Sequence, residues 1–128
     1  MSAVLPAGTR FALFDEIADG ATRGITLGEG EWPLRGLLVR MGESVHGYLN
    51  RCPHAGRQLN FLPDRFLTPD GELIQCLQHG ALFERDTGLC IAGPCVDESL
   101  TRLPVEVVAG VVQLAADLDL DKLEKGRW

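Results

Sequence analysis

Short runs rich in apolar residues recur along most of this chain, and Gly, Pro, Asn or Asp separates them. Such runs are typical of short strands, and residues 21–27 also alternate between apolar and polar positions, as a half-buried strand does. Strands are therefore expected at residues 10–14, 21–27, 34–40, 44–49, 72–75, 81–84, 89–91, 104–108 and 111–114. Many short strands separated by turns predict an all-β fold, a small barrel or sandwich of antiparallel sheets.

The clearest predicted hairpin joins residues 34–40 to residues 44–49. Gly42 lies between these two apolar runs, and a glycine at such a place favours a tight antiparallel turn. Residues 1–8 are small and are expected to be loosely held. At the other end, residues 117–125 are expected to form a short acidic helix or tail, within an acidic C-terminal stretch at 117–128.

Length and charge narrow the class of protein. The 128 residues fit one domain. A net charge of −6 argues against a nucleic-acid partner and favours a basic protein partner. No apolar run reaches the roughly 18 residues of a membrane span, and the N-terminus lacks a basic segment followed by a long apolar one. We therefore expect a cytoplasmic protein without a membrane span.

Two short segments carry the candidate chemistry: Cys52-Pro53-His54 and Cys76-Leu77-Gln78-His79, with 21 residues between them. Each segment offers one thiolate and one imidazole, and each is expected to follow a strand directly. In the cytoplasm thiols stay reduced, so cysteines in short motifs are more often metal ligands than disulfide partners. The two segments therefore predict a metal site.

The kind of metal site follows from the mixture of ligands. The four residues could be unrelated, or they could hold tetrahedral zinc, which accepts two Cys and two His. Zinc fingers usually group like ligands together, however, and Cys-x-His is a tight span for one ion. A [2Fe–2S] centre in which two histidines replace two cysteines on one iron requires mixed pairs. We therefore favour a dinuclear cluster held by Cys52, His54, Cys76 and His79.

The pattern around these ligands resembles that of the Rieske iron–sulfur family. The residues that carry the resemblance are the four ligands with Gly80, Phe83, Gly88, Gly93 and Pro94. The resemblance implies stacked antiparallel β-sheets in a single domain, residues 1–128, with a cluster-binding subdomain at about residues 50–95. It also implies one [2Fe–2S] cluster per chain, with the two Cys on the inner iron and the two His on the outer iron.

Two departures from the family pattern lie in or near the ligand segments. The 21-residue spacer is longer than is usual in the family's ferredoxins, so residues 61–69 are expected to form an inserted surface loop. Leu77 stands where the family usually has Pro, which predicts a less stiff second ligand segment. Neither departure removes a ligand.

The residues beside the ligands separate the branches of the family. Rieske subunits of cytochrome bc complexes carry a bracing disulfide, and Arg57 and Gln78 stand in its place here. Those high-potential proteins also place Ser and Tyr hydroxyls beside the cluster, where this chain has Ala81 and Phe83. Hydrogen bonds to sulfur favour the reduced cluster. Without these donors we predict a low reduction potential, roughly −150 mV.

Counting histidines points to a carrier. A terminal Rieske oxygenase needs a second iron held by two His and a carboxylate. This chain has three His. Two of them are the predicted cluster ligands, and His46 is expected to be structural. We therefore predict a one-electron carrier rather than an enzyme, a ferredoxin between a flavin-dependent reductase and an oxygenase or another redox enzyme. The alternatives are a redox-sensing or regulatory subunit, and a structural zinc module. The sensing alternative would be favoured by a redox pair of Cys90 and Cys95, although two small buried residues are the simpler interpretation.

Overall fold

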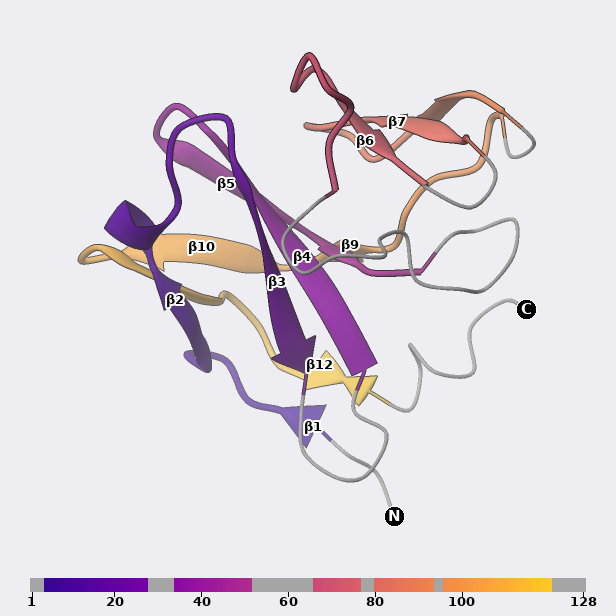
Figure 1. Cartoon of the computed structure of the whole chain (residues 1–128). Helices are drawn as coiled ribbons and strands as arrows, with labels where there is room; N and C mark the ends of the chain where they lie inside the picture. Colours follow the sequence, from indigo (N-terminus) through magenta and orange to yellow (C-terminus); the bar gives the residue numbers. More distant parts are fainter. Residues whose placement is uncertain (1–3, 28–33, 52–65, 77–79, 94–95, 121–128) are drawn as a thin grey trace.

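The computed structural model describes residues 4–27, 34–51, 66–76, 80–93 and 96–120 (Figure 1). These residues are almost entirely in strands and turns, with one 3₁₀ helix, η1 (Phe14–Glu16). The strands are β1 (Val4–Leu5), β2 (Arg10–Leu13), β3 (Thr22–Leu27), β4 (Leu34–Met41), β5 (Ser44–Leu49), β6 (Leu73–Gln75), β7 (Leu82–Glu84), β8 (Cys90–Ala92), β9 (Arg102–Leu103), β10 (Val105–Val108), β11 (Val111–Leu114) and β12 (Leu118–Asp119).

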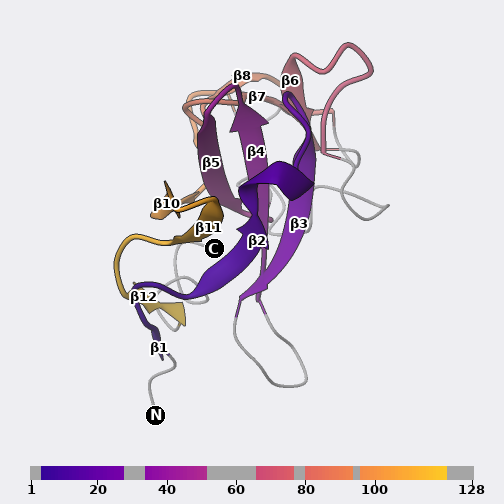
Figure 2. The same ribbon diagram turned by 90° about the vertical axis from the view of Figure 1, so that its left-hand side faces the viewer.

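The described strands form four antiparallel sheets, in the orders β3-β4-β5-β9, β10-β11-β2, β6-β7-β8 and β1-β12. In both views the β6-β7-β8 sheet lies at one end of the molecule, and β1 with β12 lies at the opposite end (Figures 1 and 2). The predicted all-β fold of stacked antiparallel sheets is confirmed.

The β4–β5 hairpin is the centre of the fold. Its strands pair from Met41 and Ser44 at the turn to Gly36 and Leu49 at the far end, and Gly42 takes a φ of +64° in the turn. This is the predicted hairpin. Its tight turn is possible because Gly42 adopts a left-handed backbone conformation, which glycine tolerates better than other residues. Four successive residues of β4 are buried, so this strand is covered on both faces.

Two apolar cores lie on the two faces of the central sheet. Leu37 and Val39 of β4 belong to a core shared with β6, β7 and β8. Leu38 points to the other face, because successive strand residues alternate, and it belongs to a core shared with β11 and β12. The β6-β7-β8 sheet is thus attached to the central sheet by its own core.

Strand pairing at the two ends of the chain was not expected. Val4 and Leu5 pair with Asp119 and Leu118, so the expectation of a loose N-terminal segment is wrong for β1. Within the acidic helix or tail expected over residues 117–125, Leu118 and Asp119 form β12 instead, with Leu118 buried in the core, whereas Leu120 is helical. Asp117 accepts a hydrogen bond from the backbone N–H of Ala7, at 2.8 Å. Residues 121–128 lie outside the described residues.

The predicted surface loop at residues 61–69 is wrong in its last part. Phe66 is 2% exposed, Leu67 forms a bridge with Ile74, and Gln75 donates a backbone hydrogen bond to Phe66, at 2.7 Å. The chain packs here because Phe66 and Leu67 are apolar and contact the core beneath β6. Residues 61–65 lie outside the described part of the chain.

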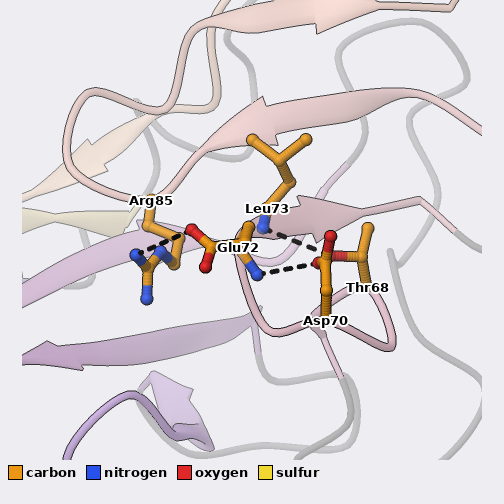
Figure 3. Close-up of polar contacts among 5 residues, drawn as sticks. All are labelled: Thr68, Asp70, Glu72, Leu73 and Arg85. Atoms are coloured by element: carbon orange, nitrogen blue, oxygen red, sulfur yellow. Dashed lines mark hydrogen bonds and ion pairs between the residues drawn. The ribbon is translucent and has the colours of Figure 1, made fainter.

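A polar turn then directs the chain into β6 (Figure 3). The hydroxyl of Thr68 donates to Asp70 and accepts from the N–H of Leu73, at 3.3 Å. Asp70 also accepts from the N–H of Glu72, at 3.0 Å, and these hydrogen bonds lower the pKa of its carboxyl. A carboxylate oxygen of Glu72 lies 3.8 Å from the guanidinium of Arg85, the residue that follows β7. Such side-chain bonds to nearby backbone groups define the turn and fix the start of β6.

Candidate metal centre

Of the four predicted ligands, Cys76 lies within the described residues, and Cys52, His54 and His79 lie outside them. No three His, Cys, Asp or Glu side chains gather as a metal site among the residues that the structure describes. The geometry of the candidate centre is therefore given by Cys76 and by the residues where the described chain borders each ligand segment.

Cys76 directly follows β6 and is buried, at 1% exposure. Its N–H donates to the carbonyl of Ala81, and its own carbonyl accepts from the N–H of Gly80, both at 2.9 Å. Gly80 takes a φ of +73°, a conformation that favours glycine. The second ligand segment is thus closed at its base by two backbone hydrogen bonds, with Cys76 as its first residue.

The first ligand segment follows β5 and starts from a fixed backbone. The N–H of Leu49 donates to Thr101 and the N–H of Asn50 donates to Arg35, both at 2.8 Å. Asn50 is 7% exposed and is the one buried polar side chain among the described residues. The N–H of Arg51 donates to Leu49 at 2.9 Å. A rigid strand end of this kind is well suited to position a ligand.

A third loop contacts the base of the second ligand segment through Gly93. Gly93 takes a φ of +97°, and a Cβ at this position would lie 2.7 Å from the Cα of Ala81. Only glycine therefore allows the two backbones to approach this closely. Ala81 and Phe83 are both fully buried, and neither side chain carries a donor that could bond a sulfur.

Cys90 is also buried, at 1% exposure, and its thiol donates to the carbonyl of Ala92, at 3.2 Å. Cys90 therefore fits the simpler interpretation of a small buried residue. Cys95 lies outside the described residues, so a redox pair with Cys90 stays a prediction.

His46 is a partly buried structural residue, as expected. Its Nδ1 lies 2.9 Å from a guanidinium nitrogen of Arg102 on β9, and Arg102 also donates to the carbonyl of Asp86, at 3.2 Å. Burial and the Arg102 charge lower the pKa of His46, against a smaller opposite effect of Asp86. Because Arg only donates, Nδ1 accepts and the imidazole is neutral. The sequence did not suggest this contact, because β5 and β9 are far apart in the chain.

Tyr48 connects the central sheet to the β6-β7-β8 sheet. Its ring is fully buried, and its hydroxyl donates to the carbonyl of Arg85, at 2.9 Å. Burial raises the pKa of Tyr48 to about 12. A Cβ on Gly88 would lie 2.8 Å from the ring, so glycine is required here too. The signal available in the sequence was that Tyr48 is the single tyrosine of the chain.

The donor set and its setting fit a [2Fe–2S] cluster. The predicted ligands would supply two thiolates and two imidazoles from two segments that follow β5 and β6. The described one, Cys76, is buried and its backbone is hydrogen-bonded to Gly80 and Ala81. Within the ranges that the structure describes, no helix has the length and apolar character needed to span a membrane. This predicted donor set, at the ends of strands in stacked antiparallel sheets, suits an iron–sulfur domain.

The particular family is shown by the sequence match. The Rieske [2Fe–2S] domain matches residues 10–113, and this chain belongs to that family. The resemblance seen in the ligand segments is thereby confirmed, and the cofactor is one [2Fe–2S] cluster per chain. A comparison with curated proteins gives no match.

Solved ferredoxins share the fold over nearly their whole length. The ferredoxin of carbazole 1,9a-dioxygenase from Nocardioides aromaticivorans IC177 matches with a TM-score of 0.65 and 24% identity, over 86% of this chain and 98% of that chain. The Sphingomonas yanoikuyae B1 ferredoxin matches with a TM-score of 0.61 and 22% identity, over 84% and 97%.

A terminal oxygenase shares the same fold in part of its length. The terminal oxygenase of carbazole 1,9a-dioxygenase from Novosphingobium sp. KA1 matches with a TM-score of 0.66 and 24% identity. The match covers 90% of this chain and 30% of the oxygenase chain. Identities this low show a shared fold and leave the activity to be argued from the site.

Proposed function

We propose that this chain is a Rieske ferredoxin, a one-electron carrier and not itself an enzyme. Its cluster would be held by Cys52 and Cys76 on the inner iron and by His54 and His79 on the outer iron. The observation that carries the proposal is the family match together with two Cys–His segments that follow β5 and β6. Support also comes from two ferredoxins that this chain matches over 98% and 97% of their length.

The cluster, when bound, supplies reversible one-electron redox chemistry. The chain's own residues set how tightly it is held. Cys76 is positioned by the backbone bonds to Gly80 and Ala81, and the Gly93 contact holds a third loop against them. Ala81 and Phe83 offer no side-chain donor, which supports a potential near the low end of the family range, roughly −150 mV.

The partners proposed are a flavin-dependent reductase upstream and an oxygenase or another redox enzyme downstream. A structure described as the complex of reduced oxygenase and oxidised ferredoxin in carbazole 1,9a-dioxygenase shares this fold, with a TM-score of 0.61 and 22% identity. A carrier must bind and leave quickly, and small, electrostatically steered contacts suit that task. We place the protein in the cytoplasm, as a single domain over residues 1–128 with a cluster-binding subdomain at 50–95.

The carrier function is tested by electron transfer. The purified protein is reduced chemically under anaerobic conditions and mixed with an oxygenase component freed of its own ferredoxin, and cluster reoxidation is followed by absorbance. Rapid reoxidation, with product formed when a reductase and NADH are added, is expected. A reducible cluster that no oxygenase or other redox enzyme reoxidises would instead favour the sensing or regulatory alternative.

A further inference from the structure

Apolar side chains are exposed along β8 and the loop that follows it. Leu89 is 38% exposed, Ile91 is 46% exposed and Val96 is 50% exposed. These three residues are here called the β8 patch. Strand β8 is an edge strand of the β6-β7-β8 sheet (Figure 2).

Backbone hydrogen bonds bring the members of the β8 patch together. Cys90 donates to Glu98 at 2.8 Å and accepts from Asp97 at 3.3 Å, and Leu89 forms a bridge with Ser99. Ile91 follows Cys90, and Val96 precedes Asp97. The two residues therefore lie on facing segments of chain, next to these hydrogen bonds. Because the Cys90 side chain is buried, its neighbours Leu89 and Ile91 point to the opposite, solvent-facing side of the strand.

Gly93 connects the β8 patch to the base of the second ligand segment. Gly93 lies between Ile91 and Val96 in the chain, and a Cβ on Gly93 would lie 2.7 Å from the Cα of Ala81. The carbonyl of Ala81 accepts the N–H of Cys76. A protein that covered the patch would therefore lie close to Gly93, which approaches the backbone of Ala81 at the base of the second ligand segment.

Acidic residues border the patch. Asp97 and Glu98 follow Val96 directly, and both are exposed. The chain as a whole carries a net charge of −6. An apolar centre with a charged rim is the usual anatomy of a specific interface, and complementary charge on the partner speeds encounter.

We propose that the β8 patch is the docking surface for the electron-transfer partner, a protein whose own docking face is apolar and rimmed by Lys or Arg. The inference rests on the proposed carrier function and adds the surface and the partner's chemistry. Ile91 and Val96 are the apolar anchors, and Asp97 and Glu98 steer the encounter. The patch is small, which suits a complex that must dissociate after each transfer.

The chain offers a matched control, because isolated exposed apolar residues are common and carry no function by themselves. Leu13 is 54% exposed and Val108 is 45% exposed. Both pair with Val111, so they lie on one face of the separate β10-β11-β2 sheet. The double variant Leu13→Ser/Val108→Ser therefore removes as much exposed apolar surface as Ile91→Ser/Val96→Ser, but away from the β8 patch.

The test compares two electron acceptors by stopped-flow absorbance. Cytochrome c serves as a redox protein with a lysine-rimmed docking face, and benzoquinone serves as a small neutral acceptor that needs no docking. The quantity compared is the ratio of the two second-order rate constants, so that any change in the cluster itself cancels. Ile91→Ser/Val96→Ser should lower this ratio about tenfold, the scale of truncating two interface anchors.

Each outcome decides one claim. The conservative variant Val96→Thr should lower the ratio about threefold, since it loses about one buried methyl group. A ratio for Ile91→Ser/Val96→Ser equal to that of the control double variant overturns the docking surface. A wild-type protein that reduces benzoquinone but not cytochrome c also overturns it and leaves the carrier function standing. A wild-type protein that reduces neither acceptor overturns the carrier function itself.

The acidic rim has its own readout. Asp97→Asn/Glu98→Gln should make the fall of the cytochrome c rate with added salt shallower, because salt screens attraction between opposite charges. Asn tolerates the left-handed backbone of Asp97, whose φ is +77°. The control Asp15→Asn/Glu43→Gln removes two exposed acids elsewhere. Equal salt dependence in the two double variants overturns the steering role.

Discussion

The hydroxyl of Tyr48 donates a hydrogen bond to the backbone carbonyl of Arg85, at 2.9 Å. Tyr48 lies on β5, which leads into the first ligand segment, and Arg85 follows β7, which comes after the second. This bond therefore ties together the two parts of the chain that carry the predicted ligands. The close approach of Gly88 to the Tyr48 ring reinforces the same junction.

Replacing Tyr48 with Phe should lower the free energy of unfolding by about 1 kcal/mol, because the partly buried Arg85 carbonyl loses its donor. For a chain of this size that corresponds to a fall in Tm of about 4 °C, measured by circular dichroism. The control is Thr9→Val, which removes an exposed hydroxyl that bonds the carbonyl of Pro6. A Tyr48→Phe protein as stable as the Thr9→Val protein would show that the junction contributes nothing.

Gly93 and Gly80 allow a matched comparison of two glycine-to-alanine variants. Both have positive φ, but a Cβ on Gly93 would meet the Ala81 backbone at 2.7 Å, whereas a Cβ on Gly80 would have nothing within 4 Å. Gly80→Ala should cost about 1–2 kcal/mol of backbone strain. Gly93→Ala should cost more and also displace the third loop, speeding loss of the cluster to a chelator, followed by absorbance. Equal rates of cluster loss in the two variants would contradict the role given to the Gly93 contact.

His46 should make the fold sensitive to acid. Burial and the Arg102 charge lower its pKa from 6.5 in the folded protein, so the unfolded chain takes up the proton first. Stability is therefore fully present above about pH 6.5 and falls as the pH drops toward the folded pKa. Protonation would place two cations where Nδ1 now accepts from Arg102, at 2.9 Å.

The test measures Tm between about pH 7.5 and pH 5 for the wild type and for His46→Gln. The contribution of His46 to the pH dependence of stability is the difference between the two Tm curves. The wild type should lose more stability across this window than the variant, which has no group to titrate at this position. Parallel Tm curves for the two proteins would show that His46 is not the source of the acid sensitivity.

The β4–β5 hairpin was predictable because it consists of two short runs rich in apolar residues, separated by Gly42. The β4–β5 hairpin and the strand Val111–Leu114 form as expected. The β1–β12 pairing was not predictable, since strands of two residues have no measurable period and their partners lie at opposite ends of the chain. Contacts of long range are fixed by tertiary packing, which a local pattern does not contain.

The candidate site, like the fold, could be predicted from the sequence only in part. The ligand spacing identified the family, because a mixed Cys–His pair at each of two strand ends suits few metal centres. The burial of Phe66 was missed because the long spacer contains Pro and Gly and therefore resembles a surface loop. Phe66 and Leu67 nevertheless pack in the same core as Ile74. The Arg102 contact of His46 was missed as well, because only the β5–β9 pairing brings them together.

The predicted low potential can be raised by one hydroxyl. Ala81 is fully buried and follows the second ligand segment, and Ala81→Ser would supply the hydroxyl donor that the family resemblance associates with a high potential. A hydrogen bond that favours the reduced cluster should raise the midpoint by about 60 mV, a tenfold change for a one-electron couple. Ala115→Ser, at an exposed position at the end of β11, is the control for voltammetry. A midpoint equal in the two variants would count against the role given to the missing hydroxyl.

The central claim is a [2Fe–2S] cluster with two cysteine and two histidine ligands. The most direct test is metal and sulfide analysis of the purified protein, combined with pulsed electron paramagnetic resonance of its reduced form. We expect one [2Fe–2S] cluster per chain with coupling to two imidazole nitrogens, and loss of this signal in His54→Ser and His79→Ser. A colourless protein with one tightly bound zinc ion, or a cluster signal unchanged in both variants, would contradict the assignment.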